Sequence, residues 1–408
     1  MIRFPKDFLW GAATSAYQVE GNNLNSDWRQ WEKKAGIEQC GAACRHYDFY
    51  ARDFDLAKAL HHNAHRFSIE WSRIEPKDGR FSRKELRHYL DVVLALRRRG
   101  LEPVVTLHHF TNPAWFAKRG GWADPRSVSR FARYCETVVR TLGKHVRYWV
   151  TINEPTIYIS HAYLFGVWPP QEKSYLKAAA VEENLISAHL KAYRLIHERY
   201  KARRLPEPCV GIAQNVMAFV PRNPELKNRF AAFVRDRFYN LGFLDGILRQ
   251  GSFPHKAMDF IGVNYYSRQL VQLKEFGIPN LAMDVGVDAR CEKNSLGWDV
   301  YPRGIYEVLV GLGQYRLPLM ITENGICTSN DRQRWSYISR HLKQVHRAMD
   351  KGVRVIGYLY WSLMDNFEWD KGFGPRFGLI GIDYTTHKRT VRKSARLYAR
   401  VCKTCILP

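Results

Sequence analysis

Two glutamates each follow a short apolar run and precede a turn-forming residue. Glu154 ends the run RYWVTINEP (147–155), and Glu323 ends LPLMITENG (317–325). A carboxylate at the tip of a buried strand is costly unless it is paired or used in chemistry. Glycoside hydrolysis needs two such groups, an ionised carboxylate that attacks the anomeric carbon and a protonated one that assists the leaving oxygen. The two runs therefore predict an acid pair.

Further polar and aromatic residues stand at or just beyond the ends of similar runs. They are Gln18, His109, Asn153, Asn215, Tyr266, Trp361, Glu368 and Trp369. Together they supply amide, imidazole, carboxylate and indole groups, which is the mixture that binds a hydroxyl-rich ring. We therefore expect a site for a small sugar substrate.

The elements that must position these residues form a regular series. Eight runs rich in β-branched or aromatic residues are predicted as strands, within 8–21, 64–76, 102–113, 147–155, 209–221, 259–268, 317–325 and 354–369. Amphipathic helical patterns separate them, for example over 84–100, 127–143 and 184–200. Gly100 is expected to close the first of these helices.

Strands that alternate with helices imply an α/β fold, a closed (β/α)8 TIM barrel. Closure explains why no linker or change of composition divides the chain, so we expect a single catalytic domain over residues 1–408. In such a barrel the C-terminal ends of the strands meet at one mouth, where mouth-facing polar side chains are candidates for function. The two glutamates are expected there.

The composition fits a large folded chain with a basic exterior. The 408 residues are 46% apolar and carry a formal net charge of +24, from 63 Lys and Arg against 39 Asp and Glu. This charge fits a nucleic-acid binder or an anionic ligand, but it equally fits solvated helix faces. No nucleic-acid-binding motif accompanies the basic clusters, so we do not expect a nucleic-acid partner.

The cysteines and the N-terminal residues bear on cellular location. The eight cysteines are irregularly placed, and the single C-x-x-C, Cys402 and Cys405, has no second pair nearby. MIRFPKDFLWGAATSAYQVEG shows neither a signal peptide nor a membrane anchor. A cytoplasmic protein without membrane partners is expected, and the sequence leaves its oligomeric state open.

At this point seven ordered motifs carry a resemblance. The set SAYQVEG, RFSIEWSRI, LHHFTNP, TINEP, GVNYYSR, ITENG and WSLMDNFEW resembles glycoside hydrolase family 1, the β-glucosidases and their relatives, from residue 4 to about residue 400. The resemblance implies a (β/α)8 barrel, retention of anomeric configuration and neither a metal nor an organic cofactor. The implied substrates are terminal β-D-glucosyl residues, with galactosyl and fucosyl residues as alternatives.

The resemblance also implies roles for single residues. Glu154 corresponds to the acid/base and Glu323 to the nucleophile, with Arg66 and Tyr266 as the groups flanking the nucleophile. It places Gln18, His109, Asn153, Glu368 and Trp369 around the ring hydroxyls and Trp361 beneath the ring. Asn153 would contact the 2-hydroxyl, Phe377 would form a further wall, and Trp298 would be a platform for the leaving group.

The two acids need opposite environments. The nucleophile has to stay ionised, whereas the acid/base needs a raised pKa, which an apolar site and the nearby negative charge would supply. For a retaining pair, the two carboxyl groups are expected about 5 to 5.5 Å apart.

The sequence departs from the family pattern in four places. Phe110 follows His109 where relatives usually have Trp, and Thr111 replaces a common Asp. Only the connector QGSFPHKAM (250–258) precedes the sixth strand, where relatives carry a longer, partly helical insertion. The loop after Gly325 is also short. We expect a more open or mobile flank and a wider mouth.

Four other functions compete with this interpretation. A 6-phospho-β-glycosidase would use the basic charge, but a carboxylate at Glu368 would repel phosphate. A metal-dependent hydrolase could use His61, His62, His108 and His109, although no ligand-type spacing accompanies them. A sugar-binding barrel without catalysis would be expected to lack one of the two glutamates. The fourth competing function is that of a basic nucleic-acid adaptor.

Overall fold

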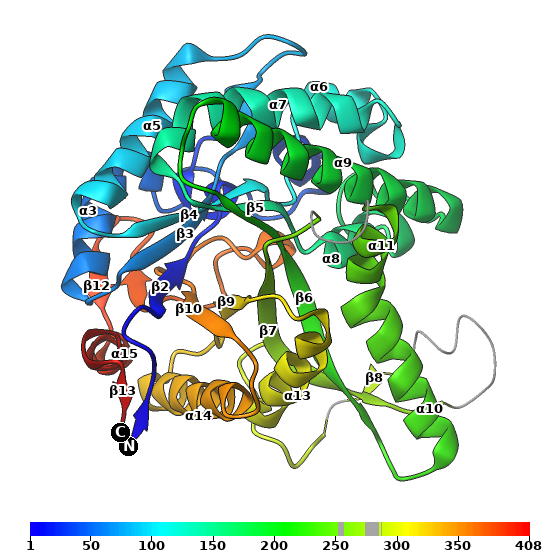
Figure 1. Cartoon of the computed structure of the whole chain (residues 1–408), viewed down its shortest axis with the longest axis vertical. Coiled ribbons are helices and arrows are strands. Elements are labelled where there is room, and N and C mark those ends of the chain that lie inside the picture. The colour runs from blue at the N-terminus through cyan, green and yellow to red at the C-terminus, as the bar shows by residue number, and fades with distance from the viewer. Residues whose placement is uncertain (252–256, 274–284, 287) are drawn as a thin grey trace.

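The computed structural model describes residues 1–251, 257–273, 285–286 and 288–408. All eight predicted strands are present: β2 (Leu9–Ala13), β3 (Ala64–Ser68), β4 (Glu102–His108), β5 (Tyr148–Asn153), β6 (Cys209–Pro221), β7 (Phe260–Val271), β9 (Leu319–Asn324) and β10 (Val355–Trp361). They follow one another around a closed parallel barrel, in which β6 pairs with β7 and β10 returns to pair with β2 (Figure 1). The predicted (β/α)8 barrel is confirmed.

Short strands lie outside the barrel ring. They are β1 (Ile2–Arg3), β8 (Val285–Gly286), β11 (Ile380–Ile382), β12 (Arg389–Val391) and β13 (Ile406–Leu407). β1 and β13 form an antiparallel pair, in which Ile2 is the partner of Leu407. This pair places the two ends of the chain side by side (Figure 1).

Helices surround the barrel (Figure 1). The α-helices are α1 (Ala16–Glu20), α2 (Asp27–Ala35), α3 (His46–Ala59), α4 (Trp71–Ile74), α5 (Arg83–Arg98), α6 (Ala114–Lys118), α7 (Ser127–Leu142), α8 (Pro155–Ile159), α9 (Tyr175–Ala202), α10 (Leu226–Arg235), α11 (Gly242–Gln250), α13 (Pro302–Leu312), α14 (Asp331–Met349) and α15 (Lys393–Thr404). Shorter helical turns are η1 (Gly121–Ala123), η2 (Gly143–His145), η3 (Ser160–Leu164), η4 (Asp236–Leu241), η5 (Gly313–Tyr315) and η6 (Trp369–Lys371).

The ends of α5 show how local sequence sets these helices. Ser82 caps the N-terminus, where its hydroxyl accepts a hydrogen bond from the Glu85 backbone N–H (3.3 Å). Gly100 follows the C-terminus with φ of +68°, a conformation that glycine adopts without steric cost. The helix predicted over 84–100 is therefore confirmed. The helix predicted over 184–200 is longer, because α9 begins at Tyr175, after the cap Ser174.

The floor of the barrel is apolar. Seven strands each contribute one fully buried residue to a separate cluster, made of Ala64, Val104, Val150, Ala213, Phe260, Met320 and Leu359. Arg66 and Thr106 lie two residues further along β3 and β4, so they share the face of the floor residues one step nearer the mouth. The polar site therefore lies above an apolar layer of side chains.

Gly325, which follows β9, permits a close approach between neighbouring strands. A Cβ atom at this position would lie 1.8 Å from the backbone oxygen of Trp361 at the end of β10. No side chain fits into that space. The glycine of ITENG thus lets the Glu323 and Trp361 strand ends pack together.

Several predicted boundaries differ from the structure. The run 8–21 contains a strand only over Leu9–Ala13, and Gln18 lies on helix α1. Trp369 lies on the turn η6, eight residues beyond the end of β10. Of the short connector 250–258, residues 252–256 lie outside the described residues, and so does the flank predicted to be open or mobile.

Candidate active site

Glu154 stands at the junction between a strand and a helix. It follows the last residue of β5 and is the N-cap of α8, with Pro155 in the first turn. Its φ of +45° lies in the left-handed region, which is costly for a residue with a side chain. Its backbone N–H donates to Ala213 O on β6 (2.7 Å). Strain of this kind concentrates at functional sites.

The Glu154 carboxyl group contacts neutral donors. Its Oε1 accepts from Asn215 Nδ2 (2.9 Å) and from Asn264 Nδ2 (2.8 Å). Burial and the negative charge of Glu323 raise the pKa of Glu154 to about 8, although the two amides and Arg66 oppose the shift. At neutral pH the group is therefore mainly protonated.

Glu323 lies on β9, and its two oxygens have different partners. Oε1 is paired with the Arg66 guanidinium, and Oε2 accepts from the Tyr266 hydroxyl (2.6 Å). Arg66 is completely buried, and Glu323 is 4% exposed. A permanent positive charge and a phenol donor are the partners of an ionised carboxylate. The structure thus brings Glu323, Arg66 and Tyr266 together.

Arg66 also orients the neighbouring polar groups. Its Nε donates to Thr106 Oγ1 (3.1 Å) and its second terminal nitrogen to Asn153 Oδ1 (2.6 Å). Asn153 Oδ1 also accepts from Asn264 Nδ2 (3.1 Å), and Asn153 Nδ2 lies 3.3 Å from His109 Nε2. One guanidinium therefore links the surroundings of both glutamates.

Gln18 and Glu368 form a second polar group. Gln18 Nε2 donates to the Phe367 carbonyl (2.8 Å), to Asn366 Oδ1 (3.1 Å) and to Glu368 Oε2 (3.4 Å). Burial first, and then the charges of Glu323 and Glu154, raise the pKa of Glu368 to about 8. Glu154 and Glu368 thus share this region with Glu323, whose charge favours the neutral form of both.

Aromatic rings line the same region. The His109 ring is nearly parallel to Trp361 (6.2 Å between centroids, 16°) and to Trp369 (6.0 Å, 14°). Burial first, and then the Arg66 charge, hold the pKa of His109 well below its usual range. Its Nδ1 is buried and has no hydrogen-bond partner within the described part of the chain. The ring therefore keeps one polar nitrogen without a partner inside the site.

Phe377, expected as a further wall, and Trp298, expected as a platform for the leaving group, both lie next to Tyr266. Phe377 is buried, whereas Trp298 is 38% exposed. The Tyr266 ring centroid lies 6.1 Å from Phe377 and 6.0 Å from Trp298, and those two rings are 6.3 Å apart. Trp298 therefore presents a partly exposed ring beside the buried nucleophile candidate.

Phe110, where Trp was expected from the family pattern, lies between two indoles. Its ring packs 5.1 Å from Trp168 and 5.2 Å from Trp369. Trp168 directs its Nε1 to Asp370 Oδ1 (3.1 Å). The neighbouring Thr111 donates to Glu70 Oε2 (2.9 Å), so it makes a structural contact.

Two residues that contact the site, Asn264 and Tyr239, were not predicted. Asn264 donates to Glu154 and accepts from Thr322 Oγ1 (2.6 Å), and the Tyr239 hydroxyl donates to Asn215 Oδ1 (2.8 Å). Asn264 stands directly before Tyr265 and Tyr266 in the NYY motif, so its position beside Tyr266 in that motif is the signal that could have identified it. Tyr239 lies on η4, outside the strands, and no pattern marks it.

The rival metal site finds no support in the described residues. No group of three or more His, Cys, Asp or Glu side chains able to hold a metal occurs in 1–251, 257–273, 285–286 and 288–408. His108 contacts Asn112 Oδ1 through Nε2 (3.0 Å), and burial lowers its pKa to about 4. Cys402 is buried and Cys405 is half-buried, both as free thiols.

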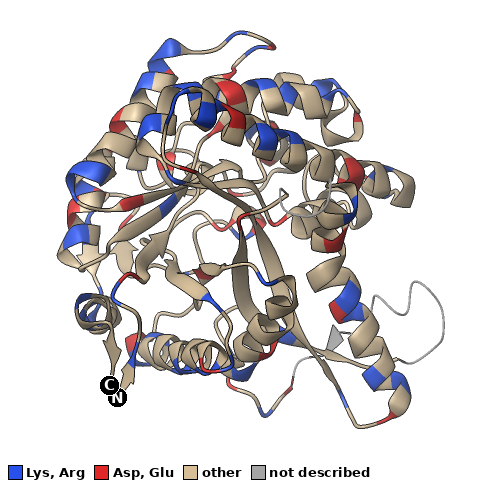
Figure 2. Ribbon diagram, viewed as in Figure 1, with Lys and Arg blue, Asp and Glu red and all other residues tan. Residues whose placement is uncertain are grey.

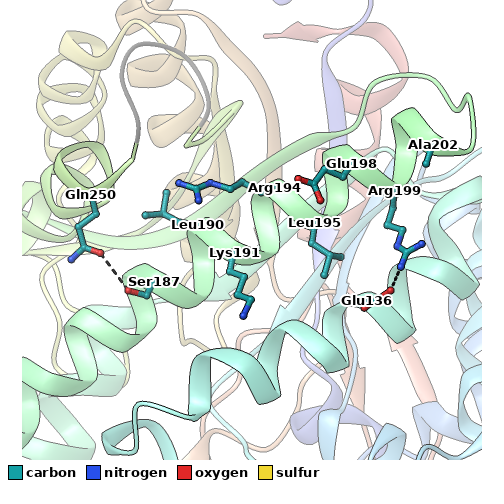
Figure 3. A pocket seen from close by; sticks show the side chains of 10 residues that line it. All are labelled: Glu136, Ser187, Leu190, Lys191, Arg194, Leu195, Glu198, Arg199, Ala202 and Gln250. Atoms are coloured by element: carbon teal, nitrogen blue, oxygen red, sulfur yellow. Dashed lines mark hydrogen bonds and ion pairs between the residues drawn. The ribbon is translucent and has the colours of Figure 1, made fainter.

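A groove on the outer surface is separate from this site. It runs along α9, and Figure 3 shows its lining side chains, which include Lys191, Arg194 and Glu198. Arg199 is paired with Glu136 of α7, and Ser187 Oγ donates to Gln250 Oε1 (3.4 Å). None of the residues around the two glutamates lines it, so the groove is not part of the candidate active site.

Comparisons with known proteins find relatives along nearly the whole chain. The sequence model of Glycosyl hydrolase family 1 matches residues 1–258 and 255–405, and the two matches meet at the shortened connector. Beta-glucosidase A of Thermotoga maritima is 31% identical, with 98% of each chain covered. A beta-galactosidase of Sulfolobus acidocaldarius is 31% identical, with 100% of this chain and 96% of the relative covered.

The fold has a solved counterpart as well. The structure of a beta-glycosidase from Pyrococcus horikoshii is similar, with a TM-score of 0.93 and 40% identity over 100% of this chain and 96% of that one. Both the family model and these relatives span nearly the whole sequence. The chain therefore belongs to glycosyl hydrolase family 1.

Proposed function

We propose that the chain hydrolyses terminal β-D-glycosides with retention, through a covalent glycosyl-enzyme, with Glu323 as nucleophile and Glu154 as acid/base. The observation that carries the proposal is the contrast between the two acids. Glu323 is paired with Arg66 and Tyr266, whereas Glu154 contacts only neutral amides and has its pKa raised to about 8. One group is thus ready to attack and the other to donate a proton at neutral pH.

The donors to Glu154 also locate its proton. Asn215 and Asn264 both direct NH2 groups at Oε1, and an amide NH2 only donates. Oε1 therefore accepts, and the acidic proton is carried by Oε2. In the first step a Glu323 oxygen bonds to the anomeric carbon, the bond to the leaving oxygen breaks, and that oxygen takes the Oε2 proton.

The second step reverses the proton transfer. The charge of Glu323 is neutralised in the glycosyl ester, so the pKa of Glu154 falls and its carboxylate can accept a proton from water. The water oxygen bonds to the anomeric carbon, and the electrons of the ester bond return to Glu323. Two inversions give retention, and both acids regain their starting protonation states.

The surrounding residues suit a sugar ring. The ring hydroxyls would be bound by Gln18, His109, Asn153, Glu368 and Trp369. Trp361 would pack beneath the ring, Phe377 would form a further wall, and Trp298 would contact the leaving group. The relatives are named after glucose and galactose, so β-glucosides and β-galactosides are the first substrates to test. Glu368, together with two more carboxyl groups, disfavours a 6-phosphate.

The experiment uses azide to separate the two roles. The parent should hydrolyse aryl β-glucosides. Glu323→Gly should be inactive alone and form the α-glycosyl azide with added azide, because one inversion occurs. Glu154→Ala should form the β-glycosyl azide, because the enzyme ester still forms first. An inactive parent, or variants that azide does not rescue with these anomers, would contradict the assignment.

A further inference from the structure

The orientation of the two amides that face Glu154 has to be held by other groups. Each side-chain amide has a donor end and an acceptor end of nearly equal size, so it can bind either way round. A reversed amide would direct its oxygen at Glu154 Oε1 and oppose the carboxylate form. The acid/base therefore depends on whatever fixes these two side chains.

Asn264 is fixed by Arg66. A guanidinium only donates, so Asn153 Oδ1 must accept from it (2.6 Å). That same oxygen accepts from Asn264 Nδ2 (3.1 Å), which leaves the Asn264 NH2 group facing Glu154 (2.8 Å). The direction of this chain of hydrogen bonds is set by a permanent charge.

Asn215 lies on β6, outside that chain, and has a different neighbour. The Tyr239 hydroxyl donates to Asn215 Oδ1 (2.8 Å). Among the described residues, this oxygen is the one hydrogen-bond partner of the Tyr239 hydroxyl. Burial first, and then the Glu154 charge, hold the pKa of Tyr239 well above its usual range, so the phenol keeps its proton. A reversed Asn215 would leave this proton facing an NH2 group, without an acceptor.

Tyr239 is itself held in place by β6. It lies on η4, a π-helical turn, and its carbonyl accepts from Gln214 Nε2 (3.1 Å). The next residue, Asn240, exchanges two hydrogen bonds with the Met217 backbone (2.9 and 2.8 Å). The position of the hydroxyl is thus set before any substrate binds. Turns of this kind often occur at functional sites.

We propose that Tyr239 is a positioning residue for the reaction, which acts through Asn215 to keep Glu154 Oε1 an acceptor and the acidic proton on Oε2. This inference rests on the proposed roles of Glu154 and Glu323. Tyr239 contacts neither Glu154 nor Glu323 by a hydrogen bond, so its effect passes through the amide. In the second step, the same amide stabilises the Glu154 carboxylate that activates water.

Removal of the phenol hydroxyl has a defined direction of effect. In Tyr239→Phe, Asn215 is free to reverse, so the Glu154 carboxylate loses a donor that lowers its pKa. The alkaline limb of kcat/KM, which requires protonated Glu154, should move to higher pH by about 0.5 to 1 unit. The acidic limb of the deglycosylation rate, which requires the carboxylate, should also move to higher pH by about 0.5 to 1 unit, so that this rate falls by up to about 3- to 10-fold at a pH below the limb.

The variant leaves the charged surroundings of Glu154 unchanged. The groups that face it or its amides are Glu323 on β9, Arg66 on β3, His109 after β4, Tyr266 on β7, Glu368 before η6, and Tyr239 itself on η4. Tyr239 is the one group of these six that the variant alters. A shift of the alkaline limb is therefore assigned to the lost hydrogen bond.

The experiment measures pH profiles of kcat/KM with a phenyl β-glycoside, whose leaving group needs the Glu154 proton, for the parent, Tyr239→Phe, Asn215→Ala and the double variant. The deglycosylation rate of the same proteins is measured with a 2,4-dinitrophenyl β-glycoside, whose leaving group departs without that proton. Both single variants should shift the limb upward, and the double variant should shift no further than Asn215→Ala. Tyr315→Phe is the matched control, because its hydroxyl donates to Asp245 (2.7 Å) away from the site. Its profile should stay at the parent position.

The outcomes separate this inference from the proposed function. A limb that persists in Glu154→Gln would contradict the role of Glu154. A limb that disappears in Glu154→Gln but does not move in folded Tyr239→Phe would overturn only the positioning role. The positioning role would also be overturned if the alkaline limb of the double variant moved to higher pH than that of Asn215→Ala. If Tyr239→Phe does not fold, Tyr239→Leu is measured against the same criteria.

Discussion

The two glutamates differ in their partners more than in their burial. Glu154 is 6% exposed and Glu323 is 4% exposed. A guanidinium and a phenol contact Glu323, whereas two side-chain amides contact Glu154. Burial and the Glu323 charge raise the pKa of Glu154, whereas Glu323 is paired directly with a permanent cation. The chemistry assigned to each follows from these few neighbours.

The first prediction concerns the pH dependence of the parent. The pKa of Glu154 is raised to about 8, so kcat/KM should fall as the pH rises through that value and the acid loses its proton. Glu368 titrates in the same range and must be distinguished from it. In Glu368→Gln, kcat/KM should drop by about 10- to 100-fold with the alkaline limb retained. If the alkaline limb were lost in Glu368→Gln, it would belong to Glu368 and not to Glu154.

The second prediction concerns Phe110. Its buried ring packs against Trp168 and Trp369, so the space around the ring is already filled. The Phe110 backbone has φ of +68°. Phe110→Trp should destabilise the protein by about 1–3 kcal/mol through overpacking, and raise KM by displacing Trp369. Thermal unfolding and kinetics test this. The control Phe233→Trp, at a 61% exposed position, should change stability by less than about 0.5 kcal/mol.

At the scale of elements, the contact between the ends of β9 and β10 is the tightest constraint on the site. The missing side chain of Gly325 lets the Trp361 carbonyl approach. Gly325→Ala should therefore destabilise the protein by more than about 4 kcal/mol or prevent folding, because neither backbone can yield. Gly311→Ala is the matched control, since its new methyl group meets nothing within 4 Å and lies on α13. It should be neutral or stabilising by up to about 1 kcal/mol, as measured by denaturant unfolding.

The sequence predicts the elements better than the links between them. Runs of apolar residues reveal all eight strands, and strand-end position singles out Glu154 and Glu323, because burial and strand ends leave local patterns. Arg66, in the middle of β3, was predicted only through the resemblance of its motif to the family. The role of Tyr239 leaves none, since η4 meets β6 only in three dimensions. Gln18 reaches the site from a helix instead of a strand end. Contacts between elements, which have no sequence period, are what the patterns miss.

At the scale of the whole molecule, charge and catalysis are spatially separate. Figure 2 shows Lys and Arg spread over the surrounding helices and loops. Arg66, in contrast, is completely buried within the site. None of the helices in the described part of the chain has the length and apolar character that crossing a bilayer requires. The +24 charge therefore acts at the surface, where salt screens it.

The last prediction follows from this separation. At low ionic strength the protein should be retained on a polyanion resin, and about 0.5 M salt should release it, because the Debye length falls to a few ångströms. Over the same range, kcat/KM for a neutral aryl β-glucoside should change less than about twofold, since an uncharged substrate is not steered. If activity falls in step with release, surface charge contributes to catalysis and the separation is wrong.

The pairing of β1 with β13 has a consequence for chain connectivity. Because Ile2 lies opposite Leu407, a hairpin-length linker could join Pro408 to Met1, and new ends could be opened between Pro206 and Glu207, both exposed. Such a circular permutant would keep every barrel pairing while Glu323 preceded Glu154 along the polypeptide. The order in which the two acids are synthesised is thus independent of the geometry in which they meet.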